Sequence, residues 1–336
     1  MFVYIANTRS NNISIINAKT DNTIATVPVG EFPIALVAKS NQNFVYVSNF
    51  FSNSVSVINT NTNSVISTIA VGANPRNLVI TPDEELIYVA NQGSNNVSVI
   101  NTLTNTVTAV ISVGDAPNSL SVTPDGGMIY VTNLFSNTVS VIDRHSNSVI
   151  SNISVGQNPF DLVISPNGQR IYVTNQFSNT VSLINRHTNT VEATIPVGNA
   201  PRSLSITPDG NELYVTNSNS NDISIIDTTS NTVTNLILVE NFPLIVKITP
   251  NGEYAYVTNT GDNNVSVINV STKCIIATIP VGLNPQSIAI TPDNKKVYIP
   301  NSSSNTVSVI DTKSNNLNKT IQVGLSPFAI YIARNI

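Results

Sequence analysis

Short apolar runs alternate with polar turn signals along the whole chain. In one representative stretch, residues 78–81, 86–91, 97–101 and 107–113 are rich in Val, Ile, Leu and Tyr. The segments between them contain Thr-Pro-Asp, Gln-Gly-Ser-Asn and Thr-Asn-Thr, which are typical of turns. We therefore predict four antiparallel strands in each unit of the pattern. No segment has helical periodicity over two turns.

The pattern repeats every 42 residues, and a tyrosine in the second strand marks each copy: Tyr4, Tyr46, Tyr88, Tyr130, Tyr172, Tyr214, Tyr256 and Tyr298. Eight such copies account for all 336 residues. The third strand is largely apolar on both faces, so each sheet needs a neighbour on either side. The chain begins with the second to fourth strands (residues 2–29) and ends with a lone first strand (residues 328–332). We predict one all-β domain over residues 1–336, an eight-bladed β-propeller closed by pairing of the C-terminal strand with the N-terminal blade.

Three motifs support this architecture. The second strands contain Tyr-Val-Ser-Asn, Tyr-Val-Ala-Asn or Tyr-Val-Thr-Asn, followed by runs such as Ser-Asn-Thr-Val-Ser-Val-Ile-Asp and by Val-Gly-x-Asn-Pro junctions. Over the entire chain these motifs resemble the YVTN family of β-propeller repeats. The resemblance implies a surface-layer-type or secreted protein, and the wider class includes lactonases, an antibiotic lyase and haem-binding domains. Because one fold carries many functions, the individual residues must decide between them.

Composition excludes several classes of partner. Charged residues make up 10% of the chain, the net charge is −4, and no run of Lys or Arg occurs. Nucleic acid and anionic membranes are therefore poor partners, and no apolar stretch is long enough for a membrane helix. The single cysteine, Cys274, rules out an internal disulfide framework. We expect a monomer.

The chain opens directly on a repeat strand at residues 2–7, so we expect no cleaved leader within it. A leader removed earlier would place the protein at the cell surface or outside the cell. A chain complete as printed would be cytoplasmic.

Some polar positions are the same in every copy. An asparagine ends each second strand: Asn7, Asn49, Asn91, Asn133, Asn175, Asn217, Asn259 and Asn301. Another asparagine follows four residues later, and every third strand contains a serine. A ligand without eightfold symmetry cannot use eight equivalent amides, so we interpret these residues as structural, with each asparagine bonding the backbone of its own loop. The alternative is a ring of amides that binds glycan or peptide. We expect the tyrosine hydroxyls to bond the third-strand serines or nearby backbone.

The copies differ most in and just before the first strand, which should lie nearest the propeller axis. Seven departures are charged or aromatic and define a predicted ligand site at one end of the channel: Arg76, Phe160, Asp161, Arg202, Glu240, Lys247 and Tyr331. Such a set could hold a small polar or acidic ligand. Alternatively, these side chains line a water-filled channel, with Lys247 paired to Asp161 or Glu240.

The loops between second and third strands should lie on the same face. Phe51, Phe135 and Phe177 stand there among Asn and Ser. Exposed aromatic side chains on a weakly charged surface suit carbohydrate or protein contact. Packing of these rings on a neighbouring loop is the alternative.

Catalytic signatures are sparse. The two histidines, His145 and His187, lie in turns expected on the opposite face and have no carboxylate cluster beside them, so we predict no metal site and no cofactor. No nucleophile elbow or phosphate-binding loop occurs. We predict a non-catalytic module that presents its loop face and channel mouth to a protein, glycan or small polar ligand. The alternative is a lactonase-like hydrolase or lyase with Glu240 as base.

In that alternative, Arg76 and Arg202 stabilise an oxyanion.

Overall fold

The structure is a computed structural model that describes residues 1–39 and 43–333. These residues form strands β1 to β32 and no helix. The strands build eight antiparallel four-stranded sheets, so the fold class is the predicted eight-bladed β-propeller. Two compact units divide the chain: Met1–Ser154 with Val323–Ile336, and Val155–Gln322.

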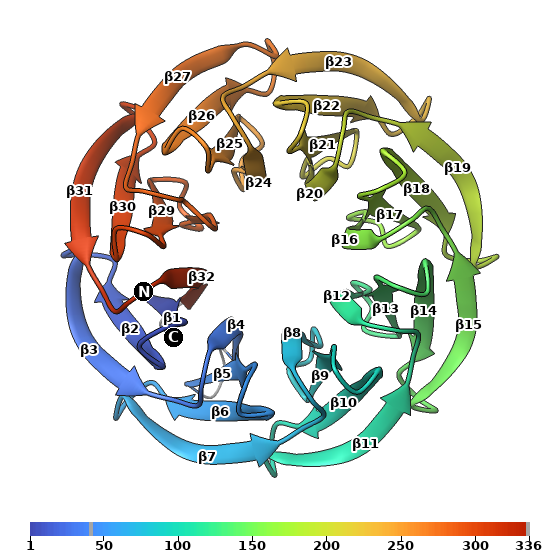
Figure 1. Ribbon diagram of the computed structural model, residues 1–336, viewed down its shortest axis with the longest axis vertical. Helices are drawn as coiled ribbons and strands as arrows, with labels where there is room; N and C mark the ends of the chain where they lie inside the picture. The colour runs from blue at the N-terminus through green and yellow to red at the C-terminus, as the bar shows by residue number, and fades with distance from the viewer. Residues whose placement is uncertain (40–42, 334–336) are drawn as a thin grey trace. The chain divides into compact units, whose positions relative to one another are not determined.

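The first unit contains four sheets, which Figure 1 shows in blue to green together with β32 in dark red. Their strands are β1 Phe2–Asn7, β2 Asn12–Asn17, β3 Asn22–Pro28 and β32 Pro327–Ala333; β4 Pro33–Lys39, β5 Phe44–Asn49, β6 Ser54–Asn59 and β7 Ser64–Ala70; β8 Pro75–Ile80, β9 Leu86–Asn91, β10 Asn96–Asn101 and β11 Thr106–Ser112; and β12 Pro117–Val122, β13 Met128–Asn133, β14 Thr138–Asp143 and β15 Ser148–Ser154.

The second unit contains the other four sheets. Their strands are β16 Pro159–Ile164, β17 Arg170–Asn175, β18 Thr180–Asn185 and β19 Thr190–Pro196; β20 Pro201–Ile206, β21 Glu212–Asn217, β22 Asp222–Asp227 and β23 Thr232–Leu238; β24 Pro243–Ile248, β25 Tyr254–Asn259, β26 Asn264–Asn269 and β27 Ile275–Pro280; and β28 Ala289–Ile290, β29 Lys296–Asn301, β30 Thr306–Asp311 and β31 Asn316–Gln322.

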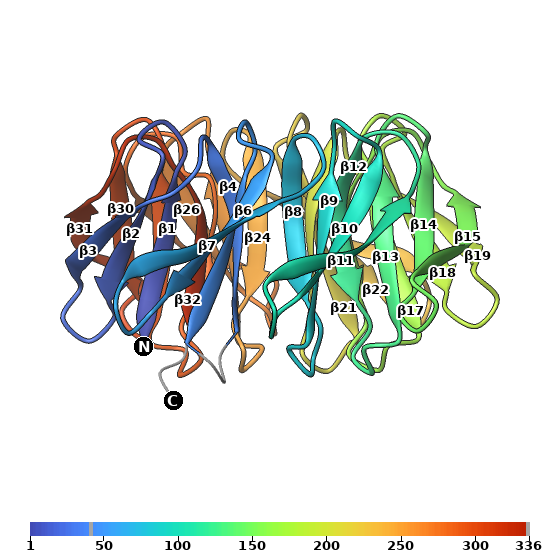
Figure 2. The same ribbon diagram turned by 90° about the horizontal axis from the view of Figure 1, so that it is seen from below.

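The closing strand pairs as the sequence predicts. Within the first unit β32 runs antiparallel to β1, and Tyr331 lies opposite Tyr4. Figures 1 and 2 both show β32 beside β1. The C-terminal strand thus supplies the first strand of the N-terminal sheet, which gives β1 a partner on both sides.

First strands begin earlier than the hydrophobic pattern indicates. We predicted residues 78–81, whereas β8 starts at Pro75, which pairs with Asn91 before the register shifts at Asn77. The same irregularity follows the proline of β12, β16, β20 and β24. At a bulge, side chains no longer alternate regularly between the two faces of the sheet. The residues just after the proline can therefore be polar.

Each sheet packs its apolar second and third strands against the next sheet of its unit. The eight repeat tyrosines are the largest fully buried side chains. In one such core, Tyr46, Val55 and Val57 pack against Leu78 and Val89 of the following sheet. Both faces of the middle strands are thus buried, as expected for sheets that cannot bury an apolar surface alone.

The asparagine that ends each second strand is structural, but its partner differs from the prediction. Asn91 Nδ2 donates to Asn96 Oδ1 at 2.8 Å and to Ser98 Oγ at 2.9 Å. The same donor bonds the third-strand serine in all eight sheets. The eight asparagines are fully buried, so no ligand can reach them.

At Tyr46 and Tyr256 the hydroxyl bonds the next sheet and not one of these serines. Tyr46 donates to Asn105 Oδ1 at 2.8 Å in the turn between the third and fourth strands of the next sheet. Tyr256 makes the equivalent bond to Asn315. These bonds join neighbouring sheets within a unit because a tyrosine is long enough to cross the core.

We call the segment between the second and third strands of a sheet the central loop, and the segment that leads from a fourth strand to the next first strand the crossover. Asn53 closes one central loop at φ 51°, a conformation that asparagine tolerates better than most residues. Its Oδ1 accepts the backbone N–H of Asn74 in the following crossover at 2.9 Å. Central loops and crossovers therefore lie on the same face, as predicted. None of the described residues belongs to a helix that could cross a membrane.

Candidate functional site

An arginine clamped between two phenylalanine rings is the most distinctive polar feature of the second unit. The Arg202 guanidinium carbon lies 5.3 Å from the centroid of the Phe160 ring and 5.4 Å from that of Phe242. Both distances are within the range of cation–π attraction, which contributes about 0.5–2 kcal/mol per contact. The three residues come from three consecutive sheets, so the arrangement depends on how those sheets pack.

Bulges and crossover bonds position the clamp. Arg202 and Phe160 each follow the proline that opens β20 and β16, at the point where the pairing register shifts. Phe242 precedes β24 and adopts φ 57°. Its N–H donates to Asn221 Oδ1 at 3.0 Å, and its carbonyl accepts the Thr260 hydroxyl at 2.8 Å. The ring is therefore carried on a fixed backbone.

The charge of Arg202 is not compensated within the described part of the chain. Its Nε is buried and has no hydrogen-bond partner there, and no carboxylate forms an ion pair with it. Burial lowers the pKa of the guanidinium below its ordinary value, because lost hydration disfavours the charged form. Arginine nevertheless stays protonated in proteins. The clamp thus holds a partly desolvated cation with unused N–H donors.

Other predicted site residues of the second unit have different surroundings. Asp161 Oδ1 accepts the backbone N–H of Leu162 at 2.9 Å. Lys247 is exposed and forms no ion pair with Asp161 or Glu240, so the expected pairing is absent from the described structure.

Glu240 is exposed at the start of the crossover that carries Phe242. Its neighbour Asn241 donates its backbone N–H to Asp262 Oδ2 at 2.8 Å and its side-chain amide to Asp262 Oδ1 at 3.1 Å. The N–H groups of Asn241 lower the pKa of the Asp262 carboxyl. In the seven other crossovers the equivalent backbone N–H donates to a central-loop serine instead. Glu240 therefore replaces the glycine of this crossover, and Asp262 replaces the serine of the central loop that bonds it.

The first unit holds the other two predicted ligand residues. Arg76 Nε donates to Asn118 Oδ1 of the neighbouring sheet. Tyr331 lies on β32 and packs against the apolar core of the first unit. Arg76 Nε therefore has an amide partner, whereas Arg202 Nε has no hydrogen-bond partner within the described ranges.

The three predicted loop phenylalanines are exposed by 58% (Phe51), 75% (Phe135) and 68% (Phe177). Phe51 also contacts two further rings of the first unit, with centroids 4.9 Å from Phe32 and 5.2 Å from Phe50. The first unit thus carries a compact aromatic cluster on its loop face.

Sequence reasoning missed Phe242. The residue before the proline is Asn, Ala or Ser in six repeats, and phenylalanine in the other two, at Phe32 and Phe242. A large apolar side chain at a position with positive φ is uncommon. That departure was readable in the sequence, but the contact with Arg202 of the preceding sheet was not.

Metal-ligating groups do not gather in the described structure. Among residues 1–39 and 43–333, no three His, Cys, Asp or Glu side chains lie close enough to hold a metal ion. His145 and His187 are exposed, and Cys274 is an exposed free thiol.

Two family models match the sequence. The model described as a YNCE-like beta-propeller matches residues 87–174 and 249–336, which together exceed half of the chain. The model described as Lactonase, 7-bladed beta-propeller matches residues 3–110. No curated protein matches the sequence.

Solved structures of similar fold have diverse functions. Hydrazine synthase of Kuenenia stuttgartiensis is 24% identical over 83% of this chain and 95% of its own, with a TM-score of 0.69. The dihydro-heme d1 dehydrogenase NirN, solved in complex with DHE, is 15% identical over 98% of this chain and 74% of its own, with a TM-score of 0.84. Apo AztD from Citrobacter koseri is 16% identical over 98% and 96%, with a TM-score of 0.74. Such identities show a shared fold only.

Proposed function

The chain belongs to the YNCE-like β-propeller family, and we propose that it is a non-catalytic binding module whose second unit binds an acidic group at Arg202. The observation that carries the proposal is a partly buried guanidinium held between two rings, with no carboxylate partner among the residues that the structure describes. An uncompensated charge at a partly buried position is costly, and a bound anion would offset that cost.

The geometry favours a carboxylate as the bound group. Phe160 and Phe242 lie against the guanidinium and restrict its orientation. Its edge N–H groups suit the two oxygens of a carboxylate, which arginine binds in bidentate fashion. A ligand that carries one carboxylate, such as an acidic sugar, a small organic acid or a peptide C-terminus, fits this chemistry.

Neighbouring residues would contact the rest of the ligand. In this proposal Asp161, Glu240 and Lys247, which belong to the same unit as Arg202, select its polar groups. The exposed Phe177 of this unit extends the contact area to a protein or glycan.

Calorimetric titration with acetate, citrate and N-acetylneuraminic acid tests the central contact. At least one carboxylate should bind, whereas acetamide should not. Charge-assisted hydrogen bonds contribute about 1.5–3 kcal/mol, so Arg202→Gln should weaken binding roughly 10- to 150-fold. Arg202→Lys should also weaken it, because an ammonium cannot form the bidentate contact.

Arg9→Gln is the matched control, since Arg9 is an exposed arginine in a central loop of the first unit. It should leave binding unchanged. Failure of every carboxylate to bind, or equal binding by the Arg202→Gln protein, would contradict the proposal.

A lactonase-like activity is the second candidate, and the match of the Lactonase family model to residues 3–110 favours it. In that reading Glu240 is the base and Arg202, which belongs to the same unit, stabilises the oxyanion. Turnover of a lactone and ester panel should then fall by orders of magnitude in Glu240→Gln. Absence of turnover by the unaltered protein would remove this candidate and leave the binding module.

A further inference from the structure

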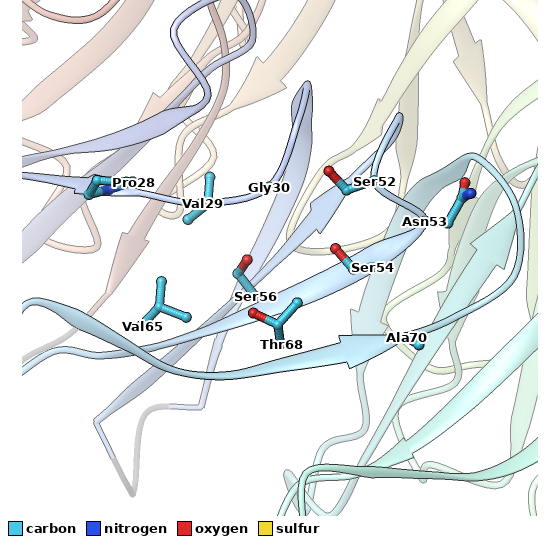
Figure 3. Close-up of a pocket in the computed structure, with 10 residues that line it drawn as sticks. All are labelled: Pro28, Val29, Gly30, Ser52, Asn53, Ser54, Ser56, Val65, Thr68 and Ala70. Atoms are coloured by element: carbon cyan, nitrogen blue, oxygen red, sulfur yellow. The ribbon is translucent and has the colours of Figure 1, made fainter.

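The first unit contains an open pocket of about 540 Å³ beside the crossover from β3 to β4. Figure 3 shows Ser52, Ser54, Ser56 and Thr68 with their hydroxyl groups on the side that faces Val29 and Gly30. The volume lies within the roughly 300–1,000 Å³ typical of small-molecule sites. No charged side chain is found among the described residues that line the pocket.

We attribute the space in this pocket to the small side chain of Ser54. Ser54 is the smallest residue at its position in the eight repeats, where the others are Asn12, Asn96, Thr138, Thr180, Asp222, Asn264 and Thr306. In the neighbouring sheets of the first unit this side chain reaches the crossover glycine: a Cβ built on Gly72 would lie 2.6 Å from Asn96 Oδ1, and one on Gly324 would lie 2.6 Å from Asn12 Oδ1.

Beside Gly30 the nearest atoms belong instead to Asn49, at 2.7 Å and 2.8 Å. Ser54 is not among the three atoms nearest to this Cβ, and its short side chain occupies less space than the asparagine of the neighbouring sheets.

Buried hydroxyl groups in the pocket have unused donors. Ser54 and Ser56 are 5% and 1% exposed, and each accepts an N–H of Asn49, at 3.1 Å and 2.9 Å. No acceptor for their own hydroxyl protons lies among the described residues. Unsatisfied buried donors are costly, and a ligand that offers neutral oxygen acceptors would satisfy them.

Aromatic residues neighbour the pocket lining in the sequence. Ser52 lines the pocket and follows Phe51, whose exposed ring packs on Phe32 and Phe50. The Ser52 hydroxyl also accepts the backbone N–H of Glu31 at 2.5 Å, which ties the pocket wall to the crossover that carries Phe32. The exposed Phe51 ring is therefore one residue along the chain from the pocket lining, although it is not itself part of that lining.

We propose that this pocket and the Phe51 ring form a binding site for an uncharged pyranose saccharide. The face of a pyranose ring presents C–H groups that stack on an aromatic side chain, and its hydroxyl oxygens accept hydrogen bonds from serine and threonine. A charged ligand would find no counter-charge in the lining. The site is distinct from Arg202, which lies in the other unit.

The test uses glucose, galactose, mannose, N-acetylglucosamine and their disaccharides, added to uniformly ¹⁵N-labelled full-length protein. At least one sugar should shift the amide signals of residues 52–56 and of Thr68 in a saturable manner. Ser54→Asn should abolish the shifts or weaken binding at least tenfold by filling the pocket. The fold already accepts asparagine at this position in neighbouring sheets, where the strand-ending asparagine bonds it.

Phe51→Ala should also weaken binding at least tenfold, whereas Leu103→Ala, which removes a 79% exposed side chain from another turn of the same unit, should not. Arg202→Gln should leave sugar binding intact, which separates this site from the proposed carboxylate site. The proposal is overturned if no sugar gives a saturable shift, if the shifts map outside the pocket, or if Ser54→Asn binds as tightly as the unaltered protein.

Discussion

The buried asparagine–serine pairs allow a quantitative test of what the repeated amides contribute. In Asn91→Ala, the hydrogen bonds to Asn96 Oδ1 and Ser98 Oγ are lost. Each such bond contributes about 1 kcal/mol net, so the free energy of unfolding should fall by about 2 kcal/mol. The Oδ1 of Asn91 has no partner among the described residues, and its removal leaves no further acceptor unsatisfied.

A double-mutant cycle isolates one of the two bonds. Urea denaturation followed by circular dichroism would compare Asn91→Ala, Ser98→Ala and the double variant, with Asn219→Ala as an exposed central-loop control. The coupling energy between Asn91 and Ser98 should be about 1 kcal/mol. The control should change stability by less than about 0.5 kcal/mol.

The sixth repeat makes the test sharper. Asn217 donates to the carboxylate of buried Asp222 at 2.6 Å, and a hydrogen bond to a charged acceptor is roughly twice as strong. Asn217→Ala should therefore destabilise the protein more than Asn91→Ala, because it leaves a buried carboxylate with one bond fewer. A coupling energy near zero for Asn91 and Ser98, together with equal effects at both asparagines, would refute this account of the amides.

Three further predictions concern the whole fold. Burial raises the pKa of Tyr46 and Tyr88 to about 12, so the unfolded chain loses these protons first, and stability should fall as the pH rises above about 10. Most of the tyrosinate absorbance at 295 nm should appear together with loss of the sheet signal. Of the ten tyrosines, Tyr254 and Tyr331 are only partly buried, so ionisation of more than two tyrosines before unfolding would be inconsistent with buried hydroxyls. Tyr46→Phe removes the 2.8 Å bond to Asn105 and should cost about 1 kcal/mol in urea denaturation, whereas an unchanged midpoint would show that this bond contributes nothing. Deletion of residues 323–336 removes the partner of β1 and should lower the melting temperature and promote association through the exposed strand edge; a monomeric variant with unaltered melting would contradict a structural role for closure.

A large part of the fold could be predicted from the sequence because equivalent residues of each repeat have the same local environment. The 42-residue period and the incomplete first and last repeats were enough to predict eight sheets and the β1–β32 pairing. The second strand of the third repeat was predicted with the bounds that β9 has, Leu86–Asn91. Alternating apolar residues and turn signals are local properties of the sequence. Because eight repeats share them, the common pattern remains clear where a single repeat departs from it.

When the repeats are aligned with one another, Arg202 and Phe160 occupy the same position, directly after the proline. The sequence therefore assigned both residues to one predicted site, and the structure places them in contact. A repeat alignment shows which positions depart from the consensus. It does not show which departures touch: the alternative pairing of Lys247 with Asp161 or Glu240 is not among the ion pairs of the described residues.

Contacts between sheets were decided by tertiary structure alone. Tyr46 and Asn105 are 59 residues apart, and their bond depends on the reach of a side chain across a packed core. The Arg202–Phe242 stacking and the pocket beside Ser54 likewise follow from how a bulge or a crossover of one sheet meets its neighbour. Periodicity determines the position of a residue within its own sheet, but the distance between two sheets is set by the packing of all the side chains between them.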